Sequence, residues 1–355
     1  MRALICSVLL ACNHVDPGVE ERACTQPFVA KIKGPRGGRV DWHPQGTEIA
    51  YDSRGLGTCY DVYTMAPNGT GSRCLTCNRS DVPSHTKGSP AYHPSGRYIV
   101  FQAEKQSHEG FYCTGSQPGM GVYDDLWILD RDLDRAYMIR AIPDGKEYGT
   151  LHPHFSHDGT KLLWSEMYAG PSSTPGFEVG RWKLMIADVA IDDGGTLGLA
   201  NIRQLAPTAD SGEGIFEAHG FTPDDRHAVF SGDPGYGTSV YSRNDIWTVD
   251  LATGVLDPIT SDHYNEHGHF SPSGAHVALM SAEDLRFGTE WYLMNPDGSG
   301  RCQLSHLNFW NPTAVTSAAD LSWAPDGTRF AGYAHILGNG APEENIYILD
   351  FGAPQ

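Results

Sequence analysis

Short stretches of alternating apolar and polar residues dominate this chain, and glycine- and proline-rich turns separate them. Alternation with a period of two predicts β-strands rather than helices. One unit recurs six times: a strand ends in an aromatic residue, a turn of the form x-Pro-x-Gly or a close variant follows, and a second strand begins. The last residues of these six turns are Gly46, Gly96, Gly159, Asp225, Gly274 and Gly327.

Each repeat is long enough for four strands. The turns are 49 to 66 residues apart, and a third strand is expected after a variable loop, at 61–65, 125–129, 184–188, 245–249, 290–294 and 345–349. Most repeats close with a fourth strand. Four antiparallel strands per repeat at this spacing predict the blades of a β-propeller.

The ends of the chain indicate how the ring closes. The last repeat lacks its fourth strand, and the early segment Phe28–Lys31 is expected to supply it, so that three late strands and one early strand form the sixth blade. We therefore predict an all-β, six-bladed propeller of four-stranded antiparallel blades, forming a single domain over 24–355.

The repeats resemble the WD40-like repeats of TolB-type propellers. The first repeat shows the pattern as Trp-His-Pro-Gln-Gly-Thr-Glu-Ile-Ala-Tyr-Asp-Ser from Trp42 to Ser53, followed by Asp-Val-Tyr-Thr-Met from Asp61 to Met65. The resemblance extends from about Arg39 to Asp350. It implies a six-bladed fold but says little about function, because propellers of this kind serve as binding scaffolds, as lids of peptidases and as enzymes.

The charge of the chain limits its partners. It has 25 lysines and arginines against 43 aspartates and glutamates, a formal net charge of −18. This charge argues against binding to a nucleic-acid backbone or to an anionic membrane surface. It leaves room for an anionic substrate, because a local pocket can be positive.

The N-terminus indicates export. Arg2 is followed by a mostly apolar run from Ala3 to Ala11, which is too short to span a bilayer. Leu9-Leu10-Ala11-Cys12 also resembles a bacterial lipoprotein box, in which Cys12 would carry a lipid anchor. The alternatives are an ordinary signal or a misplaced start codon. We expect residues 1–23 to be a leader and linker, and the propeller to be periplasmic or extracellular.

The cysteines beyond this leader fit an exported chain. They are even in number, which suggests disulfides whose pairing the sequence leaves open: Cys24, Cys59, Cys74, Cys77, Cys113 and Cys302. The Cys74-x-x-Cys77 pair has no second pair at the spacing of a zinc site, so structural bonding or inert thiols are expected.

Candidate chemistry lies where the repeat is broken. Histidines and glutamates that the repeat does not require precede the aromatic residue in three consecutive repeats: His152 and His154; Glu217 and His219; Glu266, His267 and His269. Matching positions of the first and last repeats hold Arg39, Asp41 and Asp320. The first strand of a propeller blade lines the central channel, so these side chains are expected to gather at one mouth, where the first strands begin.

These residues suit a divalent metal. A His-x-His pair places both imidazoles on one side of a strand, and imidazole with carboxylate suits zinc, manganese, iron or copper. His219 and Glu217 have the opposite register, so His219 joins the others only if Gly220 permits a β-bulge. The alternative is that the histidines line the channel and bind water or carbonyl groups.

The run His-Gly-His-Phe-Ser-Pro from His267 to Pro272 resembles that of oligogalacturonate lyases, propellers that hold a divalent metal with channel histidines and cleave uronate polymers by β-elimination. The resemblance implies His267 and His269 as ligands. The chain departs from that family in having fewer blades and in carrying Tyr264 where a glutamine is expected. The predicted metal-binding residues are His152, His154, Glu266, His267 and His269, and the predicted catalytic residues are Arg39, Glu217 and His219, with Arg39 holding a substrate carboxylate.

Two functions of different class follow from these patterns. The first is an exported metal-dependent lyase or hydrolase that acts on acidic saccharides at the channel. The second is a non-catalytic envelope propeller that binds a protein or peptide ligand. Substitution of His267 and His269 distinguishes them, because it abolishes turnover in the first case and only lowers stability in the second.

Overall fold

The computed structural model describes residues 29–31, 36–55, 57–109, 113, 117–173, 179–208, 214–234, 244–282, 288–308, 315–337 and 343–351. The predicted leader over 1–23, with Cys12, lies outside the described residues. No helix in the part of the chain that the structure describes is long and apolar enough to cross a membrane.

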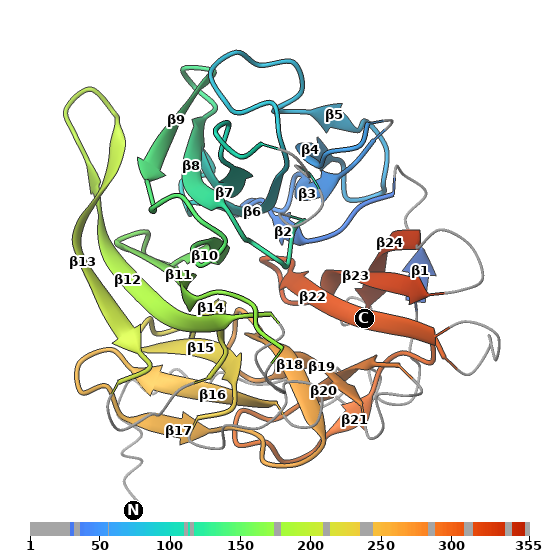
Figure 1. The fold of residues 1–355 in the computed structure, drawn as a ribbon. Coiled ribbons are helices and arrows are strands. Elements are labelled where there is room, and N and C mark those ends of the chain that lie inside the picture. Colours follow the sequence, from blue (N-terminus) through green and yellow to red (C-terminus); the bar gives the residue numbers. More distant parts are fainter. Residues whose placement is uncertain are drawn as a thin grey trace, which may run out of the picture.

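The described strands form six antiparallel sheets arranged around a common centre (Figure 1). Nearest the centre lie β2 Val40–Trp42, β6 Lys87–Tyr92, β10 Thr150–Phe155, β14 Phe216–Phe221, β18 Tyr264–Phe270 and β22 Val315–Trp323. The second strands are β3 Ile49–Ser53, β7 Tyr98–Glu104, β11 Lys161–Ala169, β15 His227–Gly232, β19 Val277–Ala282 and β23 Arg329–Leu337. This arrangement confirms the all-β, six-bladed propeller.

Outside these strands lie two further layers. The third strands are β4 Asp61–Met65, β8 Asp124–Asp130, β12 Arg181–Ile191, β16 Asp245–Asp250, β20 Glu290–Met294 and β24 Glu343–Asp350, which include all six predicted segments. The outer strands are β5 Arg73–Cys74, β9 Arg135–Arg140, β13 Leu197–Ala206, β17 Leu256–Pro258 and β21 Cys302–Gln303. In the sixth sheet, β1 Val29–Lys31 pairs antiparallel with β24, with Val29 opposite Leu349.

The backbone conformation of the repeated turn explains why five of its six copies end in glycine. Five of the six last residues are glycines with φ between 69° and 73°, a backbone conformation that costs an L-residue free energy. The fourth repeat uses Asp225 instead, with φ 55°. Its carboxylate accepts hydrogen bonds from the backbone N–H of His157 and of Asp158, both at 2.9 Å. Asp225 thus ties the turn of blade four to that of blade three.

The core lies between neighbouring sheets, where large apolar side chains of one blade pack on the next. Trp291 in β20 is fully buried, and its indole Nε1 donates a hydrogen bond to the carbonyl oxygen of Ala319 in β22 at 2.9 Å. Gly332 lets the ring approach closely, because a Cβ there would lie 2.7 Å from Trp291 Cζ2. The contact joins blade five to the channel strand of blade six.

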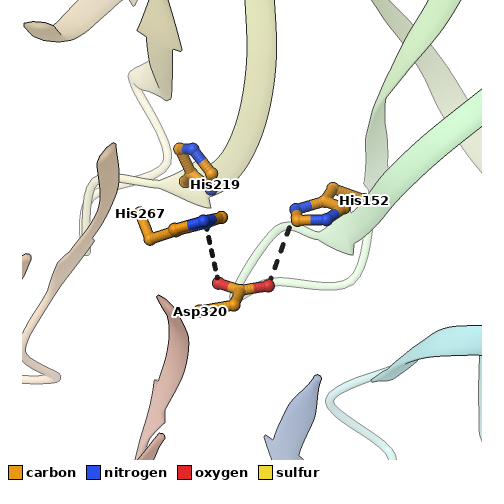
Figure 2. A group of neighbouring side chains, drawn as sticks. All are labelled: His152, His219, His267 and Asp320. Atoms are coloured by element: carbon orange, nitrogen blue, oxygen red, sulfur yellow. Dashed lines mark ion pairs between the residues drawn. The ribbon is translucent and has the colours of Figure 1, made fainter. Parts of the chain in front are cut away.

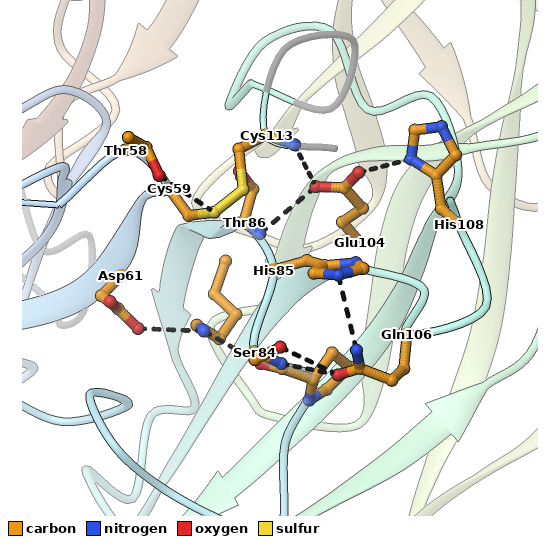
Figure 3. Close-up of a disulfide and its surroundings, with 12 residues drawn as sticks. Thr58, Cys59, Asp61, Ser84, His85, Thr86, Glu104, Gln106, His108 and Cys113 are labelled. Carbon is orange, nitrogen blue, oxygen red and sulfur yellow. Dashed lines mark hydrogen bonds and ion pairs between the residues drawn. A yellow bond between two sulfur atoms is a disulfide. The ribbon is translucent and has the colours of Figure 1, made fainter. Parts of the chain in front are cut away.

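Disulfides fix the loops of the first two blades. Cys59 pairs with Cys113 and Cys74 with Cys77, and Cys302 is also disulfide-bonded. Beside the first bridge, the buried Glu104 carboxylate accepts hydrogen bonds from the backbone N–H of Cys113 at 2.9 Å and of Thr86 at 3.3 Å (Figure 3). These contacts hold the backbone of Cys113 and that of Thr86 against the Glu104 carboxylate.

Candidate metal centre

The channel strands deviate from regular pairing at the level of the predicted site. Register shifts occur in five of them, between Gly88 and Ala91, Leu151 and His154, Ala218 and Phe221, Glu266 and His269, and Ala318 and Leu321. Three of the residues inside these bulges, Ser89, His152 and His267, have φ between 48° and 52°. A bulge re-aims the side chains at the point where it occurs.

The bulges bring four side chains from four blades together: His152, His219, His267 and Asp320. One nitrogen or oxygen atom of each lies within 4.8 Å of the others, and all four residues are buried. Asp320 Oδ1 is 3.6 Å from His267 Nδ1, and Oδ2 is 3.5 Å from His152 Nδ1 (Figure 2). The ring of His219 lies 4.9 Å from that of His267. We call these four residues the His/Asp cluster.

His219 lies in this cluster because β14 contains the β-bulge at Gly220 that its place required. In β14 the shift lies one residue nearer the aromatic residue than in β10 or β18, and Gly220 adopts φ 99°. The displaced bulge cancels the difference in register. His219 therefore takes the place that His152 and His267 take in their own strands.

Replacing Gly220 with alanine tests this bulge. A Cβ there would meet only His154, at 3.9 Å, so the expected cost comes from the backbone conformation and is about 1–2 kcal/mol of unfolding free energy. We also expect the His219 ring to leave its place beside His267, because the bulge that positions it would relax. Gly198→Ala in β13 is the matched control: its Cβ would meet nothing within 4 Å and its φ is not positive. Equal denaturation midpoints for the two variants would contradict the bulge argument.

The second histidine of each His-x-His pair lies beside the cluster rather than in it. His269 Nε2 is 2.9 Å from Asp320 Oδ1, and the His154 and His269 rings are 5.7 Å apart. The two imidazoles of a His-x-His pair share one side of a strand only where the side chains alternate regularly. The bulges at His152–Pro153 and at His267–Gly268 interrupt that alternation. His269 therefore positions Asp320 in this structure.

The two predicted glutamates form a second group with His267. Ligand atoms of Glu217, Glu266 and His267 lie within 4.8 Å of one another. Glu217 Oε1 is 3.3 Å from His152 Nδ1, and Glu266 Oε1 accepts a hydrogen bond from Asn244 Nδ2 at 2.7 Å. The sequence predicts Glu266 as a metal ligand together with His152, His154 and His269. In the structure it lies with Glu217 and His267 instead.

Arg39 reaches the cluster from blade one. Its Nε donates a hydrogen bond to His152 Nε2 at 3.3 Å, and its guanidinium lies 5.0 Å from the centre of the Tyr333 ring. Gly119 packs directly on the guanidinium, since a Cβ at that residue would overlap it. Because Nε2 of His152 accepts this hydrogen bond, its ring proton is assigned to Nδ1, which lies 3.3 Å from Glu217 Oε1 and 3.5 Å from Asp320 Oδ2.

Burial controls the protonation of these groups. It lowers the pKa of His154 and of His267 to about 4, and it lowers the pKa of His152 and His219 well below their ordinary value. Burial opposes ionisation of Asp320, but the hydrogen bond with His269 and the neighbouring imidazoles lower its pKa well below the usual range. The centre therefore presents neutral imidazoles around an ionised carboxylate.

Several of these imidazole nitrogens are buried without a hydrogen-bond partner: Nδ1 of His152, both nitrogens of His219, Nδ1 of His267 and Nε2 of His154. Buried polar atoms are nearly always paired, so such a concentration requires an explanation. Neutral imidazole lone pairs and one carboxylate are the donors that first-row divalent metals prefer. The residues present thus fit a metal ion.

The folded-state pKa of His154 predicts an acid-sensitive, metal-free protein. Between its ordinary value of 6.5 and about 4, the unfolded chain binds a proton at this histidine and the folded chain does not. The stability that His154 contributes is therefore lost as pH falls through this window. The equilibrium constant for folding falls by about tenfold per pH unit. Denaturant titrations from pH 7 to 4 should show a shallower slope for His154→Gln than for wild type. Parallel slopes would contradict the prediction.

Cavities open on both sides of the His/Asp cluster. The turn-side cavity, of about 320 Å³, is lined by Arg39, three cluster residues (His152, His219 and Asp320), His154, His269 and the prolines of four repeat turns. The strand-start cavity, of about 230 Å³, is lined by Arg39, Trp182, Glu217, Tyr264, Glu266 and His267. The sequence pattern predicts all of these groups at the start of the strands, whereas three cluster residues border the opposite, turn-side cavity.

No family model matches the sequence, and no curated protein matches it. Among solved structures, TolB from Acinetobacter baumannii aligns with a TM-score of 0.52 at 17% identity, over 90% of this chain and 64% of its own. A putative TolB from Agrobacterium tumefaciens aligns with a TM-score of 0.53 at 16% identity, over 92% and 97%. An oligogalacturonate lyase in complex with manganese aligns with a TM-score of 0.53 at 12% identity, over 91% and 92%.

The chain is a six-bladed β-propeller similar to TolB and to oligogalacturonate lyase. At these identities the likeness shows the fold alone. The chain spans less than two thirds of the A. baumannii TolB, and most of the other two proteins.

Proposed function

We propose that this propeller is a metal-dependent enzyme, a lyase or hydrolase, that acts on acidic saccharides in the turn-side cavity. The observation that carries the proposal is the His/Asp cluster, in which buried imidazole nitrogens have no hydrogen-bond partner. His152, His267 and Asp320 would hold a divalent metal. Manganese is a reasonable first candidate, because the structurally similar lyase was solved with that ion.

His219 is the best candidate for the general base. Among the described residues it is the one cluster member with no ion pair to a carboxylate, and both its ring nitrogens lack a partner. Burial keeps it neutral, so it is able to accept a proton. In a lyase reaction, His219 would take the proton next to the uronate carboxylate, and the electron pair of that C–H bond would form a C=C double bond. The glycosidic C–O bond would break with its electron pair going to the leaving oxygen, which would take a proton from water.

Arg39 would bind the substrate carboxylate with charge-assisted hydrogen bonds. At present it donates to His152 Nε2. Were His152 to bind a metal through Nδ1, its proton would move to Nε2, which could then no longer accept from Arg39. Metal binding would thus free the guanidinium for the substrate. When bound, the metal supplies stabilisation of the negative charge that develops as the proton leaves.

The cellular setting in this proposal is the envelope. The apolar run after Arg2 and the Leu9–Cys12 box support an exported protein, periplasmic or extracellular, with lipid attachment at Cys12 as one arrangement. We also propose that β1 closes the ring as the fourth strand of the sixth blade. Its pairing with β24 supports this closure.

The test of function combines metal analysis with an activity screen. Protein purified without chelator is analysed for bound metal, then assayed with Mn²⁺ on polygalacturonate and other acidic polysaccharides for an ultraviolet-absorbing unsaturated product or for new reducing ends. His267→Ala should lose both metal and turnover, whereas His219→Ala should keep the metal and lose turnover. A wild-type protein that neither carries nor takes up metal would overturn the proposal.

The second candidate is a non-catalytic envelope propeller that binds a protein or peptide. The likeness to TolB over nearly the whole chain favours it. In that case His267→Ala and His219→Ala lower only the unfolding free energy, and the full-length protein binds its ligand equally well with and without chelator.

A further inference from the structure

The carboxylates of Glu217 and Glu266 form a separate feature that the proposed reaction does not use. They extend from β14 and β18 into the strand-start cavity, on the other side of the His/Asp cluster from the turn-side cavity. Their side chains are only 14% and 15% exposed, yet their oxygens lie within 4.8 Å of each other and of a nitrogen of His267. Two carboxylates held this close and this deep repel each other.

The two carboxylates differ in their contacts: Glu266 is hydrogen-bonded to the side chains of Tyr264 and Asn244, whereas Glu217 has no such partner among the described residues. Asn244, buried at the start of β16, holds Oε1 of Glu266, and Oε2 faces His267 Nε2 at 3.9 Å. No N–H or O–H group in the described ranges donates a hydrogen bond to Glu217. Its Oε1 instead faces His152 Nδ1 at 3.3 Å, a nitrogen with no hydrogen-bond partner on a side chain only 1% exposed. An unpartnered buried nitrogen is thus aimed at the carboxylate pair.

The charges nearby do not balance. Glu217, Glu266 and Asp320 bring three carboxylates to the channel, and the guanidinium of Arg39 is the cation that the structure places against them. Buried carboxylates of this kind take up either a proton or a cation.

We propose that Glu217, Glu266 and His267 form a second divalent-cation site, adjacent to the His/Asp cluster. Two carboxylates and one imidazole suit first-row ions such as Mn²⁺ or Zn²⁺ better than Ca²⁺ or Mg²⁺, which prefer oxygen ligands alone. His267 presents Nε2 to the carboxylates and Nδ1 to Asp320. Were both sites filled, His267 would serve each of them with one ring nitrogen and would give up its ring proton to solvent. The site shares His267 with the proposed metal centre but does not depend on the reaction proposed there.

The test is a count of bound ions on the full chain. Chelator-stripped protein is titrated with Mn²⁺ by calorimetry, and bound manganese is measured after gel filtration. Wild type should bind two Mn²⁺ per chain, and each of Glu217→Gln/Glu266→Gln and Asp320→Asn should bind one. The control Glu344→Gln, which removes a carboxylate bonded to Tyr60 at 2.7 Å, should still bind two. The electron spin resonance spectrum should broaden only when both sites are filled.

The outcomes separate this inference from the proposed function. One Mn²⁺ in wild type that persists in Glu217→Gln/Glu266→Gln would overturn the second site and leave the catalytic proposal intact. One Mn²⁺ that is lost in this double variant but kept in Asp320→Asn would support the carboxylate site and overturn the His/Asp cluster as metal centre. No bound ion would overturn both, and the glutamates would then share a proton.

Discussion

Replacing Asp320 with asparagine is expected to abolish tight metal binding at the His/Asp cluster and to lower turnover about 10³-fold. Asp320 is the single carboxylate of the cluster, and its two oxygens face His267 and His152 from below (Figure 2). The amide keeps the size of the side chain but removes the negative charge that offsets a divalent ion. Loss of about 4 kcal/mol of metal-derived transition-state stabilisation corresponds to that factor. Calorimetric Mn²⁺ titration and kcat measured on the active polysaccharide provide the readouts.

The control for this variant lies in the same blade. Asp326 sits in the repeat turn, where its carboxylate accepts a hydrogen bond from the backbone N–H of Thr328 at 3.0 Å and is 51% exposed. Asp326→Asn should leave metal affinity unchanged. Thermal unfolding of both variants separates a lost ligand from a lost fold. An Asp320→Asn protein that binds metal as tightly as wild type would refute the assignment of this residue.

Trp291→Phe is expected to lower both stability and metal affinity, although Trp291 lies outside the channel. Its indole N–H holds the carbonyl of Ala319, the residue before Asp320 and part of the same bulge. Phenylalanine leaves that buried carbonyl without a donor, which costs about 1–3 kcal/mol of unfolding free energy. Trp291→Ala also opens a cavity and should cost about 3–5 kcal/mol. Denaturant titration gives the first effect, and Mn²⁺ calorimetry gives the second.

Trp247→Phe is the control for the lost hydrogen bond. Trp247, in the third strand of blade four, has a buried Nε1 without a hydrogen-bond partner. Its replacement removes similar ring area and no bond, so it should be the milder substitution and should leave Mn²⁺ affinity unchanged. Equal losses of metal affinity in the two variants would show that Trp291 does not act through the Ala319 carbonyl.

The blades could be predicted because their signal is local and repeated. Each turn ends in a residue with positive φ, and the sequence marks it with glycine five times out of six. The sixth, Asp225, was recognised as a turn from its position in the repeat. Its hydrogen bonds to the turn of blade three, however, join residues 67 or more positions apart in the chain, which no local pattern encodes.

The site could be predicted only in part, because it depends on the bulges. The histidines stand out as departures from the repeat, and Gly220 marked the one bulge that was considered. The bulge at His152 carries no glycine, and in the bulge at His267 the glycine that follows is not the left-handed residue, because in both bulges the histidine itself has positive φ. Asp320 lies at the matching position of its repeat, but nothing in Ala-Ala-Asp-Leu-Ser-Trp distinguishes a metal ligand from a solvated carboxylate. The bulge between Ala318 and Leu321 and the contact with His269 give it that place.

The kinked channel strands also bear on how such a protein could change its chemistry in evolution. Blade two carries the same bulge as blades three and five, but the left-handed residue there is Ser89, whose buried hydroxyl has no hydrogen-bond partner. Blades two, three and five thus share a backbone position of similar conformation, and it holds a different side chain in blade two than in blades three and five. A single codon change at such a position can add or remove a functional group without redesigning the scaffold. A ring of this kind can therefore acquire, alter or lose an activity in small steps.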